Sequence, residues 1–417
     1  MEFGLSRITR LLHNTKLPWK AIHVAGTNGK GSVCAYTSAM LHASNVKCGR
    51  FTSPHLVDRW DCITINEAVI SSAVFHEVES TFRAKSQNEG IGASEFEVLT
   101  ATAFEIFNRE HVDVGVVEVG LGGTHDATNV LDNSVATVIT KIGHDHQEQL
   151  GHSIASITRN KAGIMRSHIP CFTDSSNVPA VLGLIQQLAN GNGTPLVLIP
   201  EEESLQDNLA HSLLKLGYMP FQITNIQLAL QAALTTLASL GRRVDKAVLY
   251  EAIAKTVWPG RLQSFNVSDL VQRRENVLLD GAHNPQAAAS LGQWVDARLR
   301  HNGKSVTWLI AISSGKDIDG ILRELLRSGD QVIAVKFPPV IGMPWVKPVH
   351  PDDVIQAARS LRCISLATSC SDGVLDALQE AARVAKDGPL VIAGSLYLIA
   401  EIFRLQAQLQ MNDQPIT

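Results

Sequence analysis

The sequence has few charged residues and no large excess of either sign. Charged side chains make up 18% of the 417 residues, with 36 basic against 40 acidic residues and a net charge of −4. A typical soluble protein carries about 25% charged residues. Partners such as nucleic acids and membrane surfaces usually require a strongly basic face, so this balance argues against both. A local basic pocket is compatible with it.

Cysteine is sparse and shows no pairing pattern. No two cysteines form a C-x-x-C pair, and the six are spread along the chain: Cys34, Cys48, Cys62, Cys171, Cys363 and Cys370. This distribution argues against a disulfide framework or a zinc ribbon and favours a reducing compartment. We therefore expect a cytoplasmic protein.

Long apolar segments are also absent. The longest run, residues 389–400, has 12 residues and includes a glycine and a serine, whereas a bilayer span needs about 20 apolar residues. The first 20 residues lack the apolar core of a signal peptide. Their four basic residues and one acidic residue leave a weak organellar signal open. We expect no association with membranes.

Short apolar runs alternate with helical patterns in the first half of the chain. Residues 21–25, 112–119 and 135–142 are predicted to be strands. Their continuous apolar character is typical of parallel strands that are covered on both faces. Helical patterns at residues 32–43 and 96–109 lie between them. The alternation predicts an α/β doubly wound domain.

A second series of strands and helices begins near residue 276. The predicted strands are residues 276–279, 306–312, 331–335 and 390–393, and the predicted helices are residues 318–327, 351–360, 373–386 and 396–409. The length favours two or three domains at about 150 residues each. We place the boundary at the helix stop and turn Trp258-Pro259-Gly260-Arg261. This predicts a large domain over residues 1–260 and a smaller one over residues 261–417.

The first predicted strand runs directly into a glycine-rich loop that opens a helix. The loop reads Gly26-Thr27-Asn28-Gly29-Lys30-Gly31-Ser32. Glycines let backbone N–H groups approach phosphates, the helix N-terminus favours negative charge, and the lysine adds a cation. The general pattern GxxxxGK[ST] is not met, because Val24 and Gly31 stand at its first glycine and its hydroxyl position. We interpret the loop as phosphate-binding rather than as a simple turn.

This loop is the first of eight motifs that resemble, in the same order, those of the folylpolyglutamate synthase and dihydrofolate synthase family of the Mur ligase superfamily. The other seven are Thr52-Ser53-Pro54-His55-Leu56, Glu118-Val119-Gly120-Leu121-Gly122-Gly123 with Asp126-Ala127-Thr128-Asn129, Asp145-His146 with Leu150-Gly151, Lys161-Ala162-Gly163-Ile164, Pro259-Gly260-Arg261, Asp280-Gly281-Ala282-His283-Asn284-Pro285 and Gly394-Ser395-Leu396-Tyr397. Two further segments favour the dihydrofolate synthase branch: Arg59-Trp60-Asp61-Cys62 and Met343-Pro344-Trp345-Val346-Lys347-Pro348.

The resemblance implies a fold and a reaction. The fold is an α/β architecture with a Mur-ligase-like P-loop ATP-binding domain, which has a parallel-rich sheet, and a smaller Rossmann-like C-terminal domain. In the reaction, a carboxylate takes the γ-phosphate of ATP to form an acyl phosphate, which an amino-acid amine then attacks. Such chemistry needs positioning and charge neutralisation more than a protein nucleophile. The sequence accordingly has no G-x-S-x-G motif.

The resemblance also assigns site residues, motif by motif. ATP contacts fall on Gly26, Thr27, Asn28, Gly29, Lys30, Gly31, Ser32, Gln222, Asn225, Arg261, Asp280 and His283. Magnesium, as two ions, falls on Ser53, Glu118, His146 and Lys161, with the lysine carbamylated. The catalytic set is Lys30, His146, Lys161 and Arg261. Because these residues come from both predicted domains, we expect domain closure to assemble the site.

Several of these residues could instead have a plain structural role. Glu118 could be an ion-paired acid at a strand end, and Lys161 a solvated helix residue. A hydrogen-bonded loop histidine is the plain role for His146. Thr224 or Asn225 could cap a helix, and Asp280 could form a turn.

Two loops depart from the family pattern near the expected acyl-substrate pocket. Thr124 and His125 stand where the family has Arg-Leu, and His144 and Gln149 where it usually has apolar or aromatic residues. Losing the arginine removes a five-donor cation, and the histidines make the pocket more polar. We assign acyl-substrate contacts to these four residues and to Asp126. The histidines of these loops fit no standard zinc spacing.

Three functions compete on these observations. The first is dihydrofolate synthase, which joins dihydropteroate to L-glutamate, because residues 94–97 and 99–100 resemble the segment beside that branch's pterin pocket. The second is a diverged ligase that joins an amino acid to a non-pterin carboxylic acid, favoured by the four departures. The third, a nucleotide-binding regulatory protein, is disfavoured by the intact ATP and metal residues. We rank the first ahead and expect a monomer.

Overall fold

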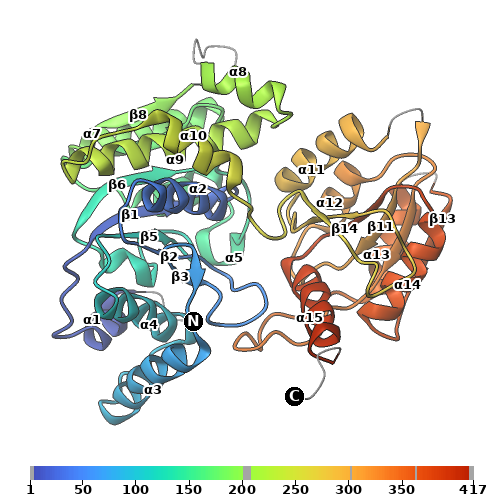
Figure 1. The fold of residues 1–417 in the computed structure, drawn as a ribbon, viewed down its shortest axis with the longest axis horizontal. Helices are drawn as coiled ribbons and strands as arrows, with labels where there is room; N and C mark the ends of the chain where they lie inside the picture. The colour runs from blue at the N-terminus through green and yellow to red at the C-terminus, as the bar shows by residue number, and fades with distance from the viewer. Residues whose placement is uncertain (1–3, 201–207, 301–302, 362–363, 413–417) are drawn as a thin grey trace. The chain divides into compact units, whose positions relative to one another are not determined.

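The chain folds into two compact α/β units. The computed structural model describes residues 4–200, 208–300, 303–361 and 364–412. Unit 1 contains the described residues of Met1–His55 and Trp60–Thr256, and unit 2 contains those of Leu56–Arg59 and Val257–Thr417 (Figure 1). A four-residue segment from early in the sequence therefore belongs to the second unit.

An eight-stranded sheet forms the middle of unit 1. Its strands are β1 (Lys20–Ala25), β2 (Cys48–Phe51), β3 (Ile63–Ile65), β4 (Ala68–Val69), β5 (Val114–Glu118), β6 (Ser134–Ile139), β7 (Cys171–Asp174) and β8 (Leu196–Ile199). They follow the order β4-β3-β2-β5-β1-β6-β7-β8, and β3 pairs antiparallel with both of its neighbours. β1 lies between β5 and β6 and is parallel to both. The carboxyl ends of these three strands therefore meet at one edge, where α/β sheets bind ligands.

Helices cover both faces of this sheet. They are α1 (Ser6–Leu11), α2 (Lys30–Ala43), α3 (Ser72–Asn88), α4 (Glu95–Arg109), α5 (Gln147–Leu150), α6 (Ile154–Ala162), α7 (Pro179–Asn192), α8 (Asn208–Lys215), α9 (Pro220–Ser239) and α10 (Lys246–Lys255), with the 3-10 helix η1 (Ala127–Val130). One layer, of α2, α8, α9 and α10, packs on one face, and α1, α3 and α4 pack on the other (Figure 1). The apolar faces of α6 and α7 form a further cluster with residues of β6 and β7.

The predicted strands of unit 1 are confirmed, with shorter bounds. β1, β5 and β6 correspond to predicted residues 21–25, 112–119 and 135–142. Nearly every residue of the three strands is buried, which explains why their apolar character is continuous rather than alternating. The predicted helix at residues 96–109 begins one residue earlier, at Glu95, because Ser94 and Glu97 form a reciprocal capping box there.

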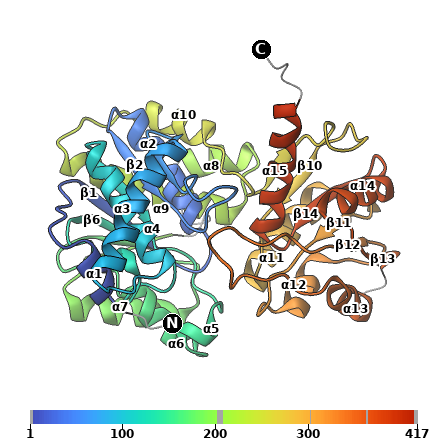
Figure 2. The ribbon, with the colours of Figure 1, turned by 90° about the horizontal axis from the view of Figure 1, so that it is seen from below.

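Unit 2 is built on a six-stranded sheet in the order β13-β12-β11-β14-β10-β9. The strands are β9 (Gln263–Phe265), β10 (Val277–Asp280), β11 (Thr307–Ile310), β12 (Gln331–Ala334), β13 (Leu366–Ser369) and β14 (Leu390–Ala393), and only β9 is antiparallel. The helices are α11 (Pro285–Arg298), α12 (Ile318–Leu325), α13 (Pro351–Leu361), α14 (Val374–Ala385) and α15 (Leu396–Asn412). Figure 2 shows the strands between α12 and α13 on one side and α14 and α15 on the other. All four predicted strands and all four predicted helices of this region are confirmed.

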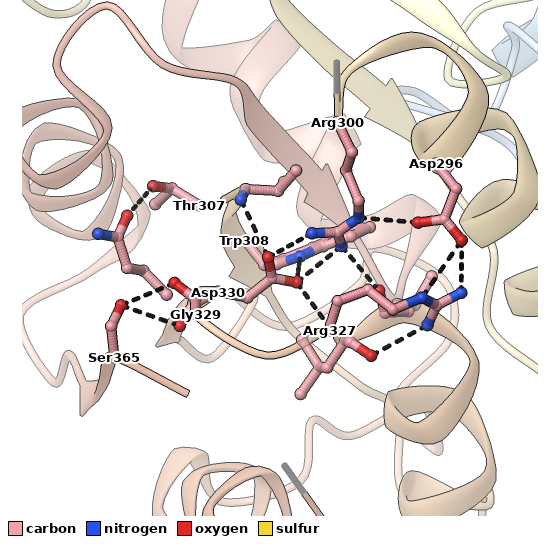
Figure 3. A network of polar contacts seen from close by, with 12 residues as sticks. Asp296, Arg300, Thr307, Trp308, Arg327, Gly329, Asp330 and Ser365 are labelled. Atoms are coloured by element: carbon pink, nitrogen blue, oxygen red, sulfur yellow. Dashed lines mark hydrogen bonds and ion pairs between the residues drawn. The ribbon is translucent and has the colours of Figure 1, made fainter. Parts of the chain in front are cut away.

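A fully buried aspartate ties together the layer that α11 and α12 form in unit 2 (Figure 3). The carboxylate of Asp330 accepts hydrogen bonds from two nitrogens of the Arg300 guanidinium, one of them at 2.7 Å. It also accepts from the indole N–H of Trp308 at 3.0 Å and from the backbone N–H groups of Val306 and Arg327 at 3.0 and 2.9 Å. A single carboxylate thus satisfies donors from β11, from the loop before β12 and from the chain after α11.

The cysteine and membrane predictions can be compared with the described residues. Cys34, Cys48, Cys62, Cys171 and Cys370 are free thiols, and Cys363 lies outside the described residues. Among the residues that the structure describes, no helix is both long enough and apolar enough to cross a bilayer.

Candidate active site

The loop after β1 accepts only glycine at two positions. Gly26 has a φ of +150°, and a Cβ there would lie 1.8 Å from Thr140 Oγ1. Gly29 caps α2 with a φ of +96°, and a Cβ there would lie 2.4 Å from Asn225 Oδ1. The first N–H groups of a helix have no partner within the helix. The N-terminus of the 14-residue α2 is therefore suited to hold phosphate.

The remaining loop residues are fixed by neighbouring backbone. The N–H groups of Thr27 and Asn28 donate to the carbonyl of Lys141 at 2.8 and 3.2 Å. Gly31 and Ser32 lie in the first turn of α2. All seven predicted loop residues are thus parts of one strand–loop–helix unit, and their contact with ATP stays a prediction.

Lys30, Ser53 and Glu118 come together at the sheet edge. Glu118 ends β5, beside β1, and its side chain is only 6% exposed. One carboxylate oxygen lies 3.7 Å from Lys30 Nζ, and the other accepts the backbone N–H of Ser53 at 3.3 Å. The ion pair that was considered as a structural role for Glu118 is present. A carboxylate and a hydroxyl are also ligands that magnesium prefers, so these residues fit the predicted metal.

Lys161 lies in the same place as the phosphate loop. Its side chain is buried, and Nζ donates to the carbonyl of Gly26 at 2.7 Å. Burial, together with the positive charge of Lys30, lowers the pKa of Lys161 to about 7, although Asp145 and Asp126 oppose this shift. The interpretation of Lys161 as a solvated helix lysine is therefore wrong.

His146 lies on the turn that begins α5. It adopts a φ of +51°, and its side chain is 47% exposed. Its Nε2 lies 3.8 Å from the carboxylate of Asp145, which also accepts the backbone N–H of His146 at 2.9 Å. Within the described ranges, no group of three or more His, Cys, Asp and Glu side chains could hold a metal. The metal-binding role of His146 stays a prediction.

Two of the predicted substrate residues hold the loop that follows Glu118. The N–H and hydroxyl of Thr124 both donate to the carbonyl of Asn160, at 2.9 and 3.1 Å. The carboxylate of Asp126 is buried and accepts the N–H groups of Leu121 and Thr128 at 2.8 and 3.0 Å. Burial raises the pKa of Asp126, and these hydrogen bonds oppose that shift. The structure thus shows a loop-holding role for both residues, and their contact with substrate is untested.

The other three predicted substrate residues, His125, His144 and Gln149, are exposed. The two loops that carry them are neighbours, because a Cβ at Gly122 would lie 2.9 Å from Leu150 Cδ2. The departures from the family pattern are therefore grouped in one region of unit 1, next to Lys161 and the glycine-rich turn.

Gln222 and Asn225, the two residues predicted for the adenine side, both lie on α9 but make different contacts. Gln222 accepts the backbone N–H of Met219 at 3.0 Å and so caps the helix. Asn225 lies directly against Gly29, since a Cβ added at Gly29 would lie 2.4 Å from Asn225 Oδ1. The hydroxyl of Thr224 donates to the backbone one turn earlier within the helix. The capping role considered for Thr224 or Asn225 therefore falls to Gln222.

In unit 2, Asp280 ends β10 and shapes the turn that follows. Its two carboxylate oxygens accept the N–H groups of Leu262 at 2.8 Å and Ala282 at 2.9 Å. Burial raises the pKa of Asp280, and the neighbouring Arg261 opposes this shift. The turn-forming role is thus realised, and a nucleotide contact by Asp280 stays a prediction.

Arg261 and His283 meet the same turn. A Cβ at Gly281 would lie 2.3 Å from a guanidinium nitrogen of Arg261, so the arginine packs directly against this turn. Nδ1 of His283 lies 2.9 Å from the carbonyl of Gly281. Nδ1 must carry the proton to make this hydrogen bond, which makes Nε2 of the neutral ring an acceptor. Unit 2 thus brings its three predicted site residues into one cluster.

Two residues near the site received no role from the sequence. Asp145 stands beside His146 and stabilises the charged form of Lys161. His23 lies fully buried in β1, three residues before the phosphate loop. The available signal for His23 was a polar residue within an otherwise apolar strand.

Known proteins resemble the chain over almost its whole length. A Schizosaccharomyces pombe protein named "Probable dihydrofolate synthetase" is 34% identical over 427 residues, which cover 97% of this chain and 98% of that protein. The chain belongs to the dihydrofolate synthase and folylpolyglutamate synthase family. The dihydrofolate synthetase of Saccharomyces cerevisiae is 33% identical, with 97% and 98% coverage. Residues 263–405 match the family described as "Dihydrofolate synthetase, C-terminal domain".

A solved structure of the family shares the fold. The folylpolyglutamate synthase of Mycobacterium tuberculosis, complexed with ADP and AMPPCP, has a TM-score of 0.79 and 26% identity, and the match covers 96% of this chain and 95% of that one. The predicted Mur-ligase-like P-loop architecture with a smaller α/β C-terminal part is confirmed. As a dihydrofolate synthase and folylpolyglutamate synthase family member, the chain is an ATP-dependent acid–amine ligase.

Proposed function

We propose that this ligase joins dihydropteroate to L-glutamate, with ATP as the energy source and magnesium as the metal. The main support is the group of Lys30, Glu118, Ser53 and Lys161 around one phosphate-binding loop, in a chain that aligns with two yeast dihydrofolate synthetases over 97% of its length. The nucleotide in the related Mycobacterium tuberculosis complex supports ATP as the phosphate donor.

The residues of the site suggest how the reaction is promoted. The loop N–H groups and Lys30 would hold the ATP phosphates and spread their charge while the carboxylate of the acid takes the γ-phosphate. Ser53, Glu118, His146 and the carbamate of Lys161 would hold magnesium, which supplies charge neutralisation at the phosphates when it is bound. Arg261, Asp280 and His283 would add nucleotide contacts from residues 261–417, which we propose as the C-terminal domain beside an ATP-binding domain of residues 1–260.

ADP release by the purified protein tests the proposal. Dihydropteroate, folates and unrelated carboxylic acids are each supplied with ATP, magnesium and a panel of amino acids. We expect turnover with dihydropteroate that depends on glutamate. Turnover only with another acid would refute the substrate assignment, and no turnover with any acid and amine would favour a nucleotide-binding regulatory protein.

The proposed carbamylation of Lys161 can be tested separately, through the pH dependence of carbon dioxide uptake. Only the neutral amine attacks carbon dioxide, forming a carbamate and releasing a proton, and a pKa of about 7 makes the neutral fraction rise as the pH increases through that value. Uptake of ¹³C-labelled carbon dioxide, followed by NMR, should therefore rise between about pH 6 and pH 8. The variant Lys161→Met should lack the signal. An equal signal in that variant would exclude Lys161 as its source.

A second candidate function rests on the grouped departures in unit 1. His125, His144 and Gln149 are exposed and adjacent to the turn that carries Thr124. Residues of this kind favour a polar acyl group, so the chain would join an amino acid to a non-pterin carboxylic acid. The reaction chemistry is the same in both candidates, and only the acid differs.

Changing these departures toward the family pattern should move the substrate preference. In the combined variant Thr124→Arg, His125→Leu and His144→Leu, kcat/KM for dihydropteroate relative to other acids should rise by about 10-fold or more if these loops select the acid. His152→Leu, an exposed histidine on the same segment, is the matched control. An unchanged preference in the combined variant would show that the loops do not select the acid.

We also propose that the protein acts as a monomer in the cytoplasm. Its free thiols are consistent with a reducing compartment. Light scattering coupled to gel filtration, and fractionation of cells, would test these two points.

A further inference from the structure

The turn after Glu118 contains three glycines within four residues, 120–123, and so has little rigidity of its own. It nevertheless lies between two predicted magnesium ligands, Glu118 and Lys161. Glu118 ends the strand before it, and a Cβ at Gly123 would lie 2.9 Å from the carbonyl oxygen of Lys161. The turn is therefore packed between the end of β5, at Glu118, and the backbone of Lys161.

A buried series of hydrogen bonds holds the backbone of this turn. Asp126 accepts the N–H of Leu121 through one carboxylate oxygen and the hydroxyl of Thr128, at 2.5 Å, through the other. Because the Thr128 hydroxyl donates its only proton to Asp126, its oxygen acts as an acceptor toward His23 Nε2, at 2.8 Å. The chain thus runs from His23 through Thr128 and Asp126 to the backbone of the turn.

Packing alone does not explain a histidine at this position. His23 and Thr128 are both completely buried. Burial, with the nearby charge of Arg166, lowers the pKa of His23 to about 3, so the ring is neutral under physiological conditions. Its Nδ1 has no hydrogen-bond partner among the described residues. Such an unsatisfied nitrogen costs free energy that an apolar ring would not, so the Nε2–H donor is the feature that distinguishes histidine here.

We propose that His23 is a positioning residue of the ligase, which acts through Thr128 and Asp126 to fix the turn between Glu118 and Lys161. The inference rests on the proposed function, and it adds three linked side chains behind the predicted metal ligands. Hydrogen bonds behind metal ligands commonly contribute about 10- to 100-fold to metal affinity or activity.

Paired variants test this positioning role. His23→Phe and Thr128→Val remove the hydrogen bonds, the first keeping a flat ring at some increase in volume and the second being nearly isosteric, whereas His23→Gln and Thr128→Ser keep a donor or a hydroxyl. We expect the first pair to lower kcat about 10- to 100-fold and to raise the magnesium concentration needed for activity, and the second pair to be close to wild type. The double variant His23→Phe/Thr128→Val should lose no more than either single variant, because both act in one chain.

A readout that does not depend on turnover separates this inference from the proposed function. Hydrogen exchange of the Leu121 amide, followed by mass spectrometry, should be slow in the wild type and fast in His23→Phe and in Thr128→Val. Slow exchange in both variants, or wild-type kcat and magnesium dependence, would overturn the positioning role. A loss of activity that only followed a lower melting temperature, with unchanged magnesium dependence, would indicate a merely structural histidine. An inactive wild type would contradict the proposed function but not the exchange result.

Discussion

Replacement of Lys30 by alanine is expected to abolish ADP release with every carboxylic acid. Lys30 Nζ is the cation of the phosphate loop and lies 3.7 Å from the buried carboxylate of Glu118. Its removal takes away the charge that would stabilise the transferring phosphoryl group, and losses of such preorganised groups cost about 10²- to 10³-fold in kcat. Because the variant also leaves a buried carboxylate without this partner, the fold must be checked by circular dichroism.

A matched control is Lys47→Ala. Lys47 is also a lysine of unit 1 paired with a glutamate, Glu110, at 3.3 Å, but both side chains are more than 40% exposed. An exposed pair of this kind contributes about 0–1 kcal/mol, so this variant should keep its activity. Undiminished turnover in Lys30→Ala, with the fold intact, would remove the phosphate-loop assignment.

The sequence predicted the strand–loop–helix unit well because its signals are local. A continuous apolar run, a glycine loop and a helix pattern lie within residues 21–43, and β1, the loop and α2 follow in that order. The predicted strands do not include the short strands β2, β3, β4, β7, β8, β9 and β13. They have two to four residues each, so periodicity carries too little information to identify them.

The site is harder to predict, because several of its side chains also make hydrogen bonds that hold the fold together. The motif containing Asp126 was recognised, but only the folded turn shows that its carboxylate holds Leu121 and Thr128. Gln222 was assigned to the adenine side, whereas its visible role is to cap α9. Nothing in the local sequence points to His23, because its hydrogen-bond partner, Thr128, lies 105 residues away. Roles that depend on such distant contacts cannot be read from spacing.

The second large effect that we expect is on the stability of unit 2 rather than on catalysis. We expect Asp330→Asn to lower the free energy of unfolding of unit 2 by about 3–5 kcal/mol, the usual cost of breaking a buried ion pair from one side. The change takes the buried carboxylate away from the Arg300 guanidinium, which is 12% exposed and keeps its pair with Asp296. The amide N–H₂ also replaces one of the two acceptor oxygens, so it faces either the N–H of Val306 or the N–H groups of Trp308 and Arg327, which need acceptors.

Asp296→Asn is the control, because Asp296 pairs with the same Arg300 and with Arg327 but is 38% exposed (Figure 3). Its loss should cost less than about 1 kcal/mol. Since the chain has two units, one melting temperature would not isolate the effect. Hydrogen exchange in increasing urea should instead be followed on separate peptides. In Asp330→Asn, peptides of β11 and β12 should lose protection at lower urea than in the control, while peptides of β1 and β5 should respond alike in both variants. Equal protection of β11 and β12 in the two variants would show that the buried carboxylate is not what stabilises unit 2.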